Sequence, residues 1–112
     1  MIELTIIGNV GRDPELRYLP DGTAVCNFSV ADTQKRGEKE ETTWVEVSAW
    51  REEAERSSKY IHKGNKVYVR GYPSVEMYDK KDGNKGIAIK ISAKTIVYLG
   101  GRQTEENDNL SL

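Results

Sequence analysis

Alternation of apolar and polar residues with a period of two runs through most of the chain and predicts a protein built mainly of strands. The clearest case is T-T-W-V-E-V-S-A-W, in which Val45, Val47 and Ala49 fall on one face of an extended segment. The other face carries Trp44 and Trp50, the only two tryptophans of the chain. Small apolar residues suit a core, whereas two large aromatic side chains on the polar face require another explanation.

The same alternation predicts four further strands, and glycine and proline mark the segments between them. Gly8 and Gly11 predict a bend or bulge in or after the first strand. Asp-Pro and Pro-Asp-Gly sequences bound residues 13–22 and predict a turn segment there. Cys26 is predicted to be a small core residue. The additional strands are expected at residues 2–7, 24–30, 66–71 and 87–92, the last with a possible continuation to residue 99.

Two segments depart from the strand pattern. Residues 32–43 are almost entirely polar and predict a long exposed hairpin arm or loop. Residues 51–64 predict one short helix that ends at Gly64. The predicted fold is therefore all-β: a five-stranded OB-fold Greek-key barrel with one short helix between strands 3 and 4 and long β-hairpin arms.

Composition is typical of one soluble globular domain. The chain has 112 residues, of which 37% are hydrophobic and 31% are charged. Its apolar runs fall well short of the roughly 20 residues that a membrane-spanning helix needs. The N-terminus resembles a strand and not a secretion signal, which predicts a cytoplasmic, nucleoid-associated protein.

The formal net charge of −1 hides an uneven distribution. All 17 basic residues lie at or before Arg102, whereas Glu105, Glu106 and Asp108 follow it. The predicted organisation is a barrel domain over residues 1–101 and a disordered acidic C-terminal tail over residues 102–112.

The sequence lacks the residue sets that catalysis or metal binding would need. The single Cys26 and the single His62 supply no zinc set, so no metal and no cofactor are expected. His62 has no obvious catalytic partner and is predicted to be solvated. A glycine-rich phosphate loop of the G-x-x-x-x-G-K type is also absent from the sequence. The protein is therefore predicted not to be an enzyme.

Four motifs in order, I-G-N-V-G, D-P-E-L-R-Y, W-V-E-V-S-A-W and Y-I-H-K-G-N-K-V-Y-V-R-G, resemble those of bacterial single-stranded DNA-binding proteins. The resemblance covers residues 2 to about 100. It implies an OB-fold that binds single-stranded DNA without sequence preference in replication, recombination or repair. It also implies a homotetramer, with a dimer as the next alternative.

Under this resemblance, Trp44 and Trp50 occupy two base-stacking positions and Tyr78 a third. Every base of a single strand has a π-face, so flat aromatic side chains can bind any sequence. Two tryptophans six residues apart on one strand would lie about 20 Å apart, far enough to serve different nucleotides. The alternative is that they cover a small core or a subunit interface, because tryptophan is usually mostly buried.

Basic residues on the same strands and loops are candidates for phosphate contacts, with ordinary solvated side chains as the alternative. Glu52, Ser74 and Glu76 stand where related proteins often have Arg or Lys. Fewer cations release fewer counterions, so we expect weaker binding and a shallower salt dependence than in a strongly basic relative. The phosphate candidates are Arg12, Lys35, Arg36, Lys63, Lys66 and Arg70.

Other functions remain open at the level of sequence. The barrel could be an interaction module of a replication or conjugation complex, or an RNA binder, because stacking distinguishes the two sugars poorly. Tyr18 and Tyr60 are predicted to pack against the barrel. The tail ends in Asn-Leu-Ser-Leu instead of the acidic Pro-Phe tip of related proteins, which predicts weak or altered recruitment of replication and repair proteins.

Overall fold

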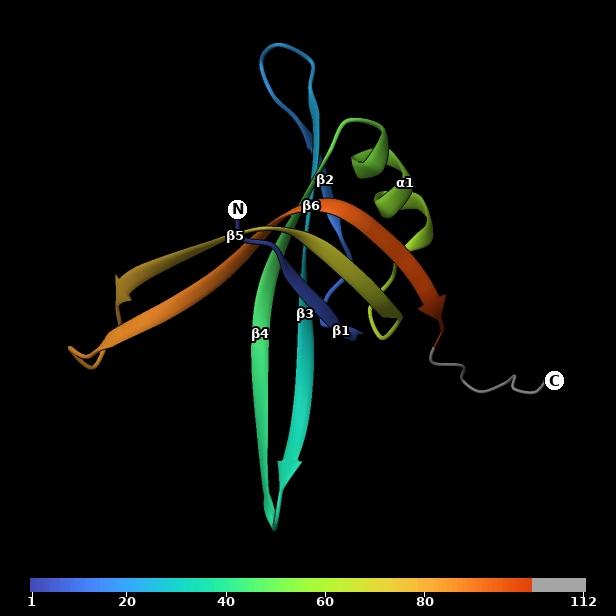
Figure 1. Cartoon of the computed structure of the whole chain (residues 1–112). Coiled ribbons are helices and arrows are strands. Elements are labelled where there is room, and N and C mark those ends of the chain that lie inside the picture. The colour runs from blue at the N-terminus through green and yellow to red at the C-terminus, as the bar shows by residue number, and fades with distance from the viewer. Residues whose placement is uncertain (102–112) are drawn as a thin grey trace, which may run out of the picture.

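The computed structural model of the chain describes residues 1–101 (Figure 1). The predicted acidic tail, residues 102–112, lies outside the described residues, so its disorder and its role in partner recruitment stay predictions. The elements in chain order are β1 (Leu4–Val10), β2 (Glu15–Tyr18), β3 (Ala24–Arg36), β4 (Lys39–Trp50), α1 (Glu52–Tyr60), β5 (Lys66–Asp79) and β6 (Lys85–Gly100).

The strands form one sheet in the order β1-β5-β6-β4-β3-β2, and an additional pairing of β1 with β3 closes it into a barrel. Strand β1 makes this closure by changing partner. It pairs with β5 along Leu4–Asn9 and with β3 at Asn9 and Val10. Gly8 lies at this change, where an added Cβ would be 2.1 Å from the carbonyl oxygen of Ala31. The predicted OB-fold barrel is confirmed, and the close approach of β1 to β3 explains the glycine.

The five strands that close the barrel are confirmed, and the sheet has one further strand that the sequence analysis does not predict. The segment between the two predicted turns pairs with Ala24–Asn27 and forms β2 at the edge of the sheet. Helix α1 consequently lies between β4 and β5, although it still follows the third of the five strands that close the barrel. The Asp-Pro and Pro-Asp-Gly sequences do mark the ends of this segment. The four residues Glu15–Tyr18 between them are enough to form a short edge strand.

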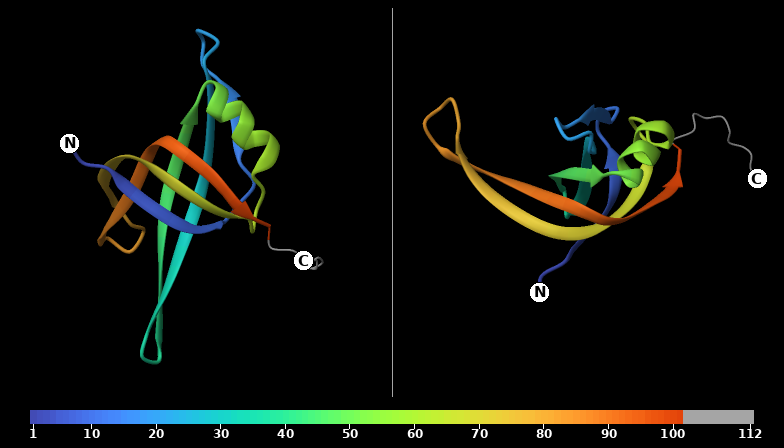
Figure 2. Two further views of the ribbon diagram at one scale, coloured as in Figure 1. Left: turned by 45° about the vertical axis from the view of Figure 1, so that its right-hand side comes forward. Right: turned by 90° about the horizontal axis from the view of Figure 1, so that it is seen from above.

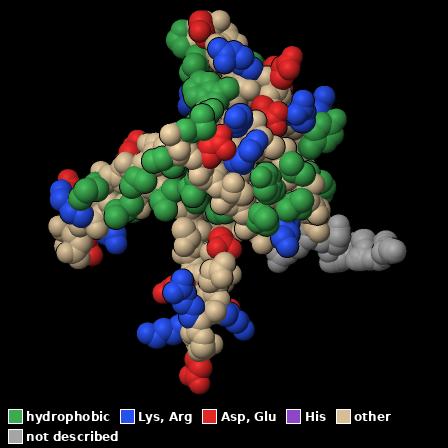
Figure 3. Space-filling model, viewed as in Figure 1, with side chains coloured by type: hydrophobic (Ala, Val, Ile, Leu, Met, Phe, Trp, Pro, Cys, Tyr) green, Lys and Arg blue, Asp and Glu red, His purple; other side chains and the backbone are tan. Residues whose placement is uncertain are grey.

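Two hairpin arms extend from the barrel in different directions (Figure 1). The β3–β4 arm, residues 32–43, confirms the predicted polar arm and is paired as far as Arg36 and Lys39. The β5–β6 arm, residues 74–90, is more apolar on its surface (Figure 3), where Val75, Met77 and Ile87 are exposed. Helix α1 lies on the other side of the barrel from the β5–β6 arm (Figure 2).

Alternate residues of the strands face the core, as the sequence predicts. Val45, Val47 and Ala49 are buried, and Phe28 at its centre is fully buried. Cys26 is also fully buried, which confirms its prediction as a core residue. Burial raises the pKa of the Cys26 thiol to about 11, so it stays protonated near neutral pH.

Helix α1 is shorter than the sequence predicts. It ends at Tyr60, and the extended backbone of Ile61 carries that side chain into the core. Gly64, the predicted stop, lies in the turn that follows, with a φ of 91°. Tyr18 and Tyr60 are 59% and 62% exposed, so less than half of each side chain is covered by the rest of the chain. Tyr18 also donates a hydrogen bond to Glu55 of α1 at 3.4 Å. Within residues 1–101, no helix has the length and apolarity needed to cross a membrane.

Candidate nucleic-acid interface

The two tryptophans lie on the outside of the barrel, as the alternation in β4 predicts. Trp44 is 54% and Trp50 38% exposed, while the residues between them alternate into the core. Trp44 lies against Gly11, where an added Cβ would be 2.4 Å from Cζ3 of the indole. Gly11 therefore provides the space that the indole occupies on the barrel.

Strand register places Tyr78 on the same face as the tryptophans. Glu46 of β4 pairs with Lys90 of β6, and Lys90 pairs with Ser74 of β5. Side chains at paired positions share a face, and Tyr78 lies four residues after Ser74 on that face. We call this surface, which includes Trp44, Glu46, Ser48, Trp50 and their paired neighbours, the outer face. Tyr78 is 50% exposed on the β5–β6 arm, and its ring lies over Gly86.

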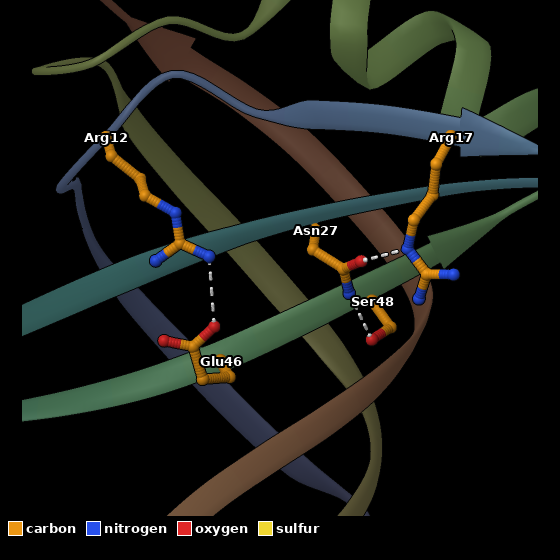
Figure 4. A network of polar contacts seen from close by, with 5 residues as sticks. All are labelled: Arg12, Arg17, Asn27, Glu46 and Ser48. Carbon is orange, nitrogen blue, oxygen red and sulfur yellow. Dashed lines mark hydrogen bonds and ion pairs between the residues drawn. The ribbon is translucent and has the colours of Figure 1, made fainter.

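A polar network crosses the outer face between the tryptophans (Figure 4). Asn27 Nδ2 donates a hydrogen bond to Ser48 Oγ at 2.8 Å, and Arg17 Nε donates to Asn27 Oδ1 at 3.4 Å. Val25 of β3 pairs with Arg17 of β2 on one side and with Trp50 of β4 on the other. Arg17 is thus a cation close to a stacking candidate. Sequence analysis does not find Arg17, because the Asp-Pro and Pro-Asp-Gly signals predict a turn segment there, although the alternation in E-L-R-Y indicates a strand.

The structure separates the predicted phosphate contacts into groups. Arg12 lies on the outer face beside β4, because its Nη2 is 3.3 Å from Oε1 of Glu46, which lies between Trp44 and Trp50 on that strand. Arg70 is on the outer face of β5, with its Nη1 3.7 Å from Glu3 Oε1. The remaining candidates lie on other elements, Lys35 and Arg36 on the β3–β4 arm and Lys63 and Lys66 in the segment from α1 into β5.

Carboxylates already pair with some cations of the outer face. Glu46 pairs with Arg12, and Glu76 Oε1 lies 3.1 Å from Lys90 Nζ. All four side chains are roughly half exposed, so a phosphate could reach the cations only in competition with these carboxylates. In the part of the chain that the structure describes, no three His, Cys, Asp or Glu side chains are grouped so that they could hold a metal ion.

The sequence model of the single-strand binding protein family matches residues 1–99 of the chain. The chain belongs to this family. Single-stranded DNA-binding proteins of two Neisseria meningitidis strains, of serogroups A and B, are 41% identical to it over 105 residues, which is 89% of this chain and 60% of each relative. A single-stranded DNA-binding protein of Paenarthrobacter aurescens is 35% identical over 100 residues, 83% of this chain and 58% of that protein. This family member thus spans about 60% of the length of these relatives.

Proposed function

We propose that the protein binds single-stranded DNA without sequence preference, by stacking bases on Trp44, Trp50 and Tyr78 and by contacting phosphates with nearby cations. The observation that carries this proposal is the placement of three exposed aromatic side chains on one continuous face of the barrel. Membership of the family and the names of the relatives support the choice of ligand. The proposed role is non-catalytic, on single strands formed at the nucleoid in replication, recombination or repair.

The chemistry of the outer face suits a ligand that is recognised by its shape and charge. Aromatic rings offer each base an apolar surface, while Arg12 and Arg17 lie where a backbone could pass. Stacking contributes roughly 1 to 3 kcal/mol per base and tolerates any sequence. Carboxylates beside the cations reduce the electrostatic contribution, so we propose that stacking supplies a large share of the affinity.

Intrinsic fluorescence tests the proposal directly. Because both tryptophans of the chain lie on the outer face, poly(dT) should quench much of the emission. Unlabelled DNA and RNA homopolymers and duplex DNA are then added as competitors. Single-stranded DNA should compete best. Preferential competition by RNA would favour the RNA-binding alternative, and no quenching by any nucleic acid would favour a protein-interaction module.

Arg17→Ala should weaken binding of poly(dT) and make its salt dependence shallower. Loss of one phosphate contact on a single strand should reduce the magnitude of the slope of log K against log[salt] by about 0.7. Arg56→Ala is the matched control, because Arg56 lies on α1 and pairs with Glu53 at 2.7 Å. An unchanged slope for Arg17→Ala, or an equal change for Arg56→Ala, would remove Arg17 from the interface.

We also propose that the protein self-associates, as a homotetramer or else as a dimer. One edge of β1 pairs with β5 along Leu4–Gly8. Within the described residues, the other edge of β1 pairs with β3 only at Asn9 and Val10, so it is unpaired between Leu4 and Gly8. An unpaired edge can accept a strand of another chain, and linked copies raise the effective concentration of each neighbouring DNA-binding face. Light scattering should give a multiple of the 12.7 kDa chain mass at micromolar concentration. A monomer that binds with full affinity would contradict this.

A further inference from the structure

Two arginines of the outer face are held by partners of different charge. Arg12 pairs with the carboxylate of Glu46, at 3.3 Å between Nη2 and Oε1. Arg17 instead donates a hydrogen bond from Nε to the amide oxygen of Asn27 at 3.4 Å. Figure 4 shows both contacts over strands β3 and β4. One arginine thus has an anionic partner and the other a neutral one.

The burial of Val25 supports the placement of Arg17 beside Trp50. Val25 pairs with both residues, one on each side, so the three side chains share the outer face. Val25 is nevertheless only 1% exposed. Cover on this face comes from neighbouring side chains, and Arg17 and Trp50 are the two directly across the strands. Strands β2 and β4 lie about 10 Å apart across β3, a distance that the long Arg17 side chain can largely span.

A second hydrogen bond fixes which end of the Asn27 amide faces Arg17. A guanidinium has only donors, so the amide presents its oxygen to Arg17. The amide nitrogen is then directed to Ser48, and Nδ2 donates to Oγ at 2.8 Å. This hydrogen bond is partly buried, so water does not easily replace either partner. Asn27 and Ser48 together hold a neutral acceptor in a fixed position against Arg17.

The difference in charge has a consequence for the binding of phosphates. Among residues 1–101, Arg17 takes part in no ion pair, and neither does Glu15, which precedes it by two residues on the same face of β2. A phosphate that binds Arg12 must displace a carboxylate of the protein. A phosphate that binds Arg17 displaces counterions of the solution instead, and their release is what makes binding depend on salt.

We propose that Asn27 is a positioning residue that holds Arg17 beside Trp50 without neutralising it. The salt-dependent phosphate contact then lies at Trp50, whereas binding near Trp44 depends on stacking and little on salt. This inference rests on the proposed function and assigns unequal roles to the two ends of the same segment of β4.

Asn27→Asp tests the role of the neutral partner. A carboxylate has nearly the shape of the amide, and the Ser48 hydroxyl can turn to donate, so both hydrogen bonds can remain while a negative charge is added. The slope of log K against log[salt] for oligo(dT) should then fall in magnitude by about 0.7 for each copy of the chain that the strand contacts. Asn27→Ala removes the acceptor without adding charge. It should weaken binding about threefold and leave the slope unchanged.

A double-mutant cycle shows whether Asn27 acts through Arg17. If it does, Asn27→Asp combined with Arg17→Ala should have the slope of Arg17→Ala alone. Additive changes of slope would mean that the new carboxylate repels the strand directly, which overturns the positioning role. Equal losses of affinity in Asn27→Asp and Asn27→Ala, with a lower midpoint of thermal unfolding and no change of slope, would show a structural role alone and would also overturn it.

Glu46→Gln is the converse substitution, and it keeps the inference testable if Asn27→Asp does not fold. It replaces the anionic partner of Arg12 by a neutral one, so the slope should rise in magnitude by about 0.7 per copy. Arg12→Ala should change the slope little in the wild type and lower it by the same amount in the Glu46→Gln background. An unchanged slope in Glu46→Gln would contradict the unequal roles of the two arginines.

The outcomes separate the inference from the function on which it rests. If the wild type binds oligo(dT) with quenching but Arg12→Ala and Arg17→Ala change the slope equally, the inference fails and the proposed function stands. If the wild type does not bind oligo(dT) at all, both fail.

Discussion

Alanine at both Trp44 and Trp50 should lower the affinity for poly(dT) by roughly 2 to 6 kcal/mol, because each stacked base contributes about 1 to 3 kcal/mol. The fold should survive the double substitution. Both side chains are exposed, whereas the alternate residues Val45, Val47 and Ala49 keep their places in the core. Anisotropy of a labelled oligonucleotide measures the binding, and circular dichroism with thermal unfolding verifies the fold.

Two controls make this result specific. Phenylalanine at both sites keeps a ring and should retain much of the affinity. Tyr60→Ala removes a more exposed aromatic side chain from α1 and should change binding little. If the folded double-alanine variant binds as tightly as the wild type, base stacking on the outer face is refuted and the protein-interaction alternative gains weight.

Gly8→Ala should destabilise the fold by about 2 to 3 kcal/mol, in the upper part of the range for an overpacked core. The added Cβ would lie 2.1 Å from the carbonyl oxygen of Ala31, a backbone atom that can move only if β1 and β3 separate. These two strands close the barrel. The expected measurement is a lower midpoint of unfolding in urea, with a reduced free energy of unfolding.

Gly11→Ala is the matched comparison for Gly8→Ala. Its Cβ would meet Cζ3 of Trp44 at 2.4 Å, but this half-exposed ring can move outward. Stability should then change little while affinity for poly(dT) falls, because the indole is displaced from its position on the barrel. Equal losses of stability in the two glycine variants would contradict the special role of Gly8 in closure.

Local patterns predicted much of this fold because its strands alternate regularly. The period of two in β4 was sufficient to separate the buried Val45 and Val47 from the exposed Trp44. The same rule placed Cys26 in the core. Residues 32–43 were recognised as an arm because a segment without apolar side chains cannot contribute to a core, and pairing of β3 with β4 accounts for its extended form.

Features that depend on distant pairing were not accessible in this way. Edge strand β2 exists because β3 offers it a free edge, and this gives Arg17 its position beside Trp50. The helix ends before Gly64 because Ile61 is needed in the core. Parallel pairing of β4 with β6, which joins residues more than 40 positions apart, places Tyr78 of β5 on the face of the tryptophans. No local pattern encodes such a register.

The ion pairs of the outer face also bear on the time that a strand stays bound. If phosphates contact Arg12 and Lys90 as proposed, then Glu46 and Glu76, which lie 3.3 and 3.1 Å from these cations, can pair with them again as soon as a phosphate leaves. Each contact can therefore open and close separately. Such stepwise exchange favours fast dissociation and lets a protein diffuse along a strand without releasing it. On this proposal, Glu46→Gln should slow both the dissociation of the strand and its diffusion, so that Glu46 would determine residence time as well as charge.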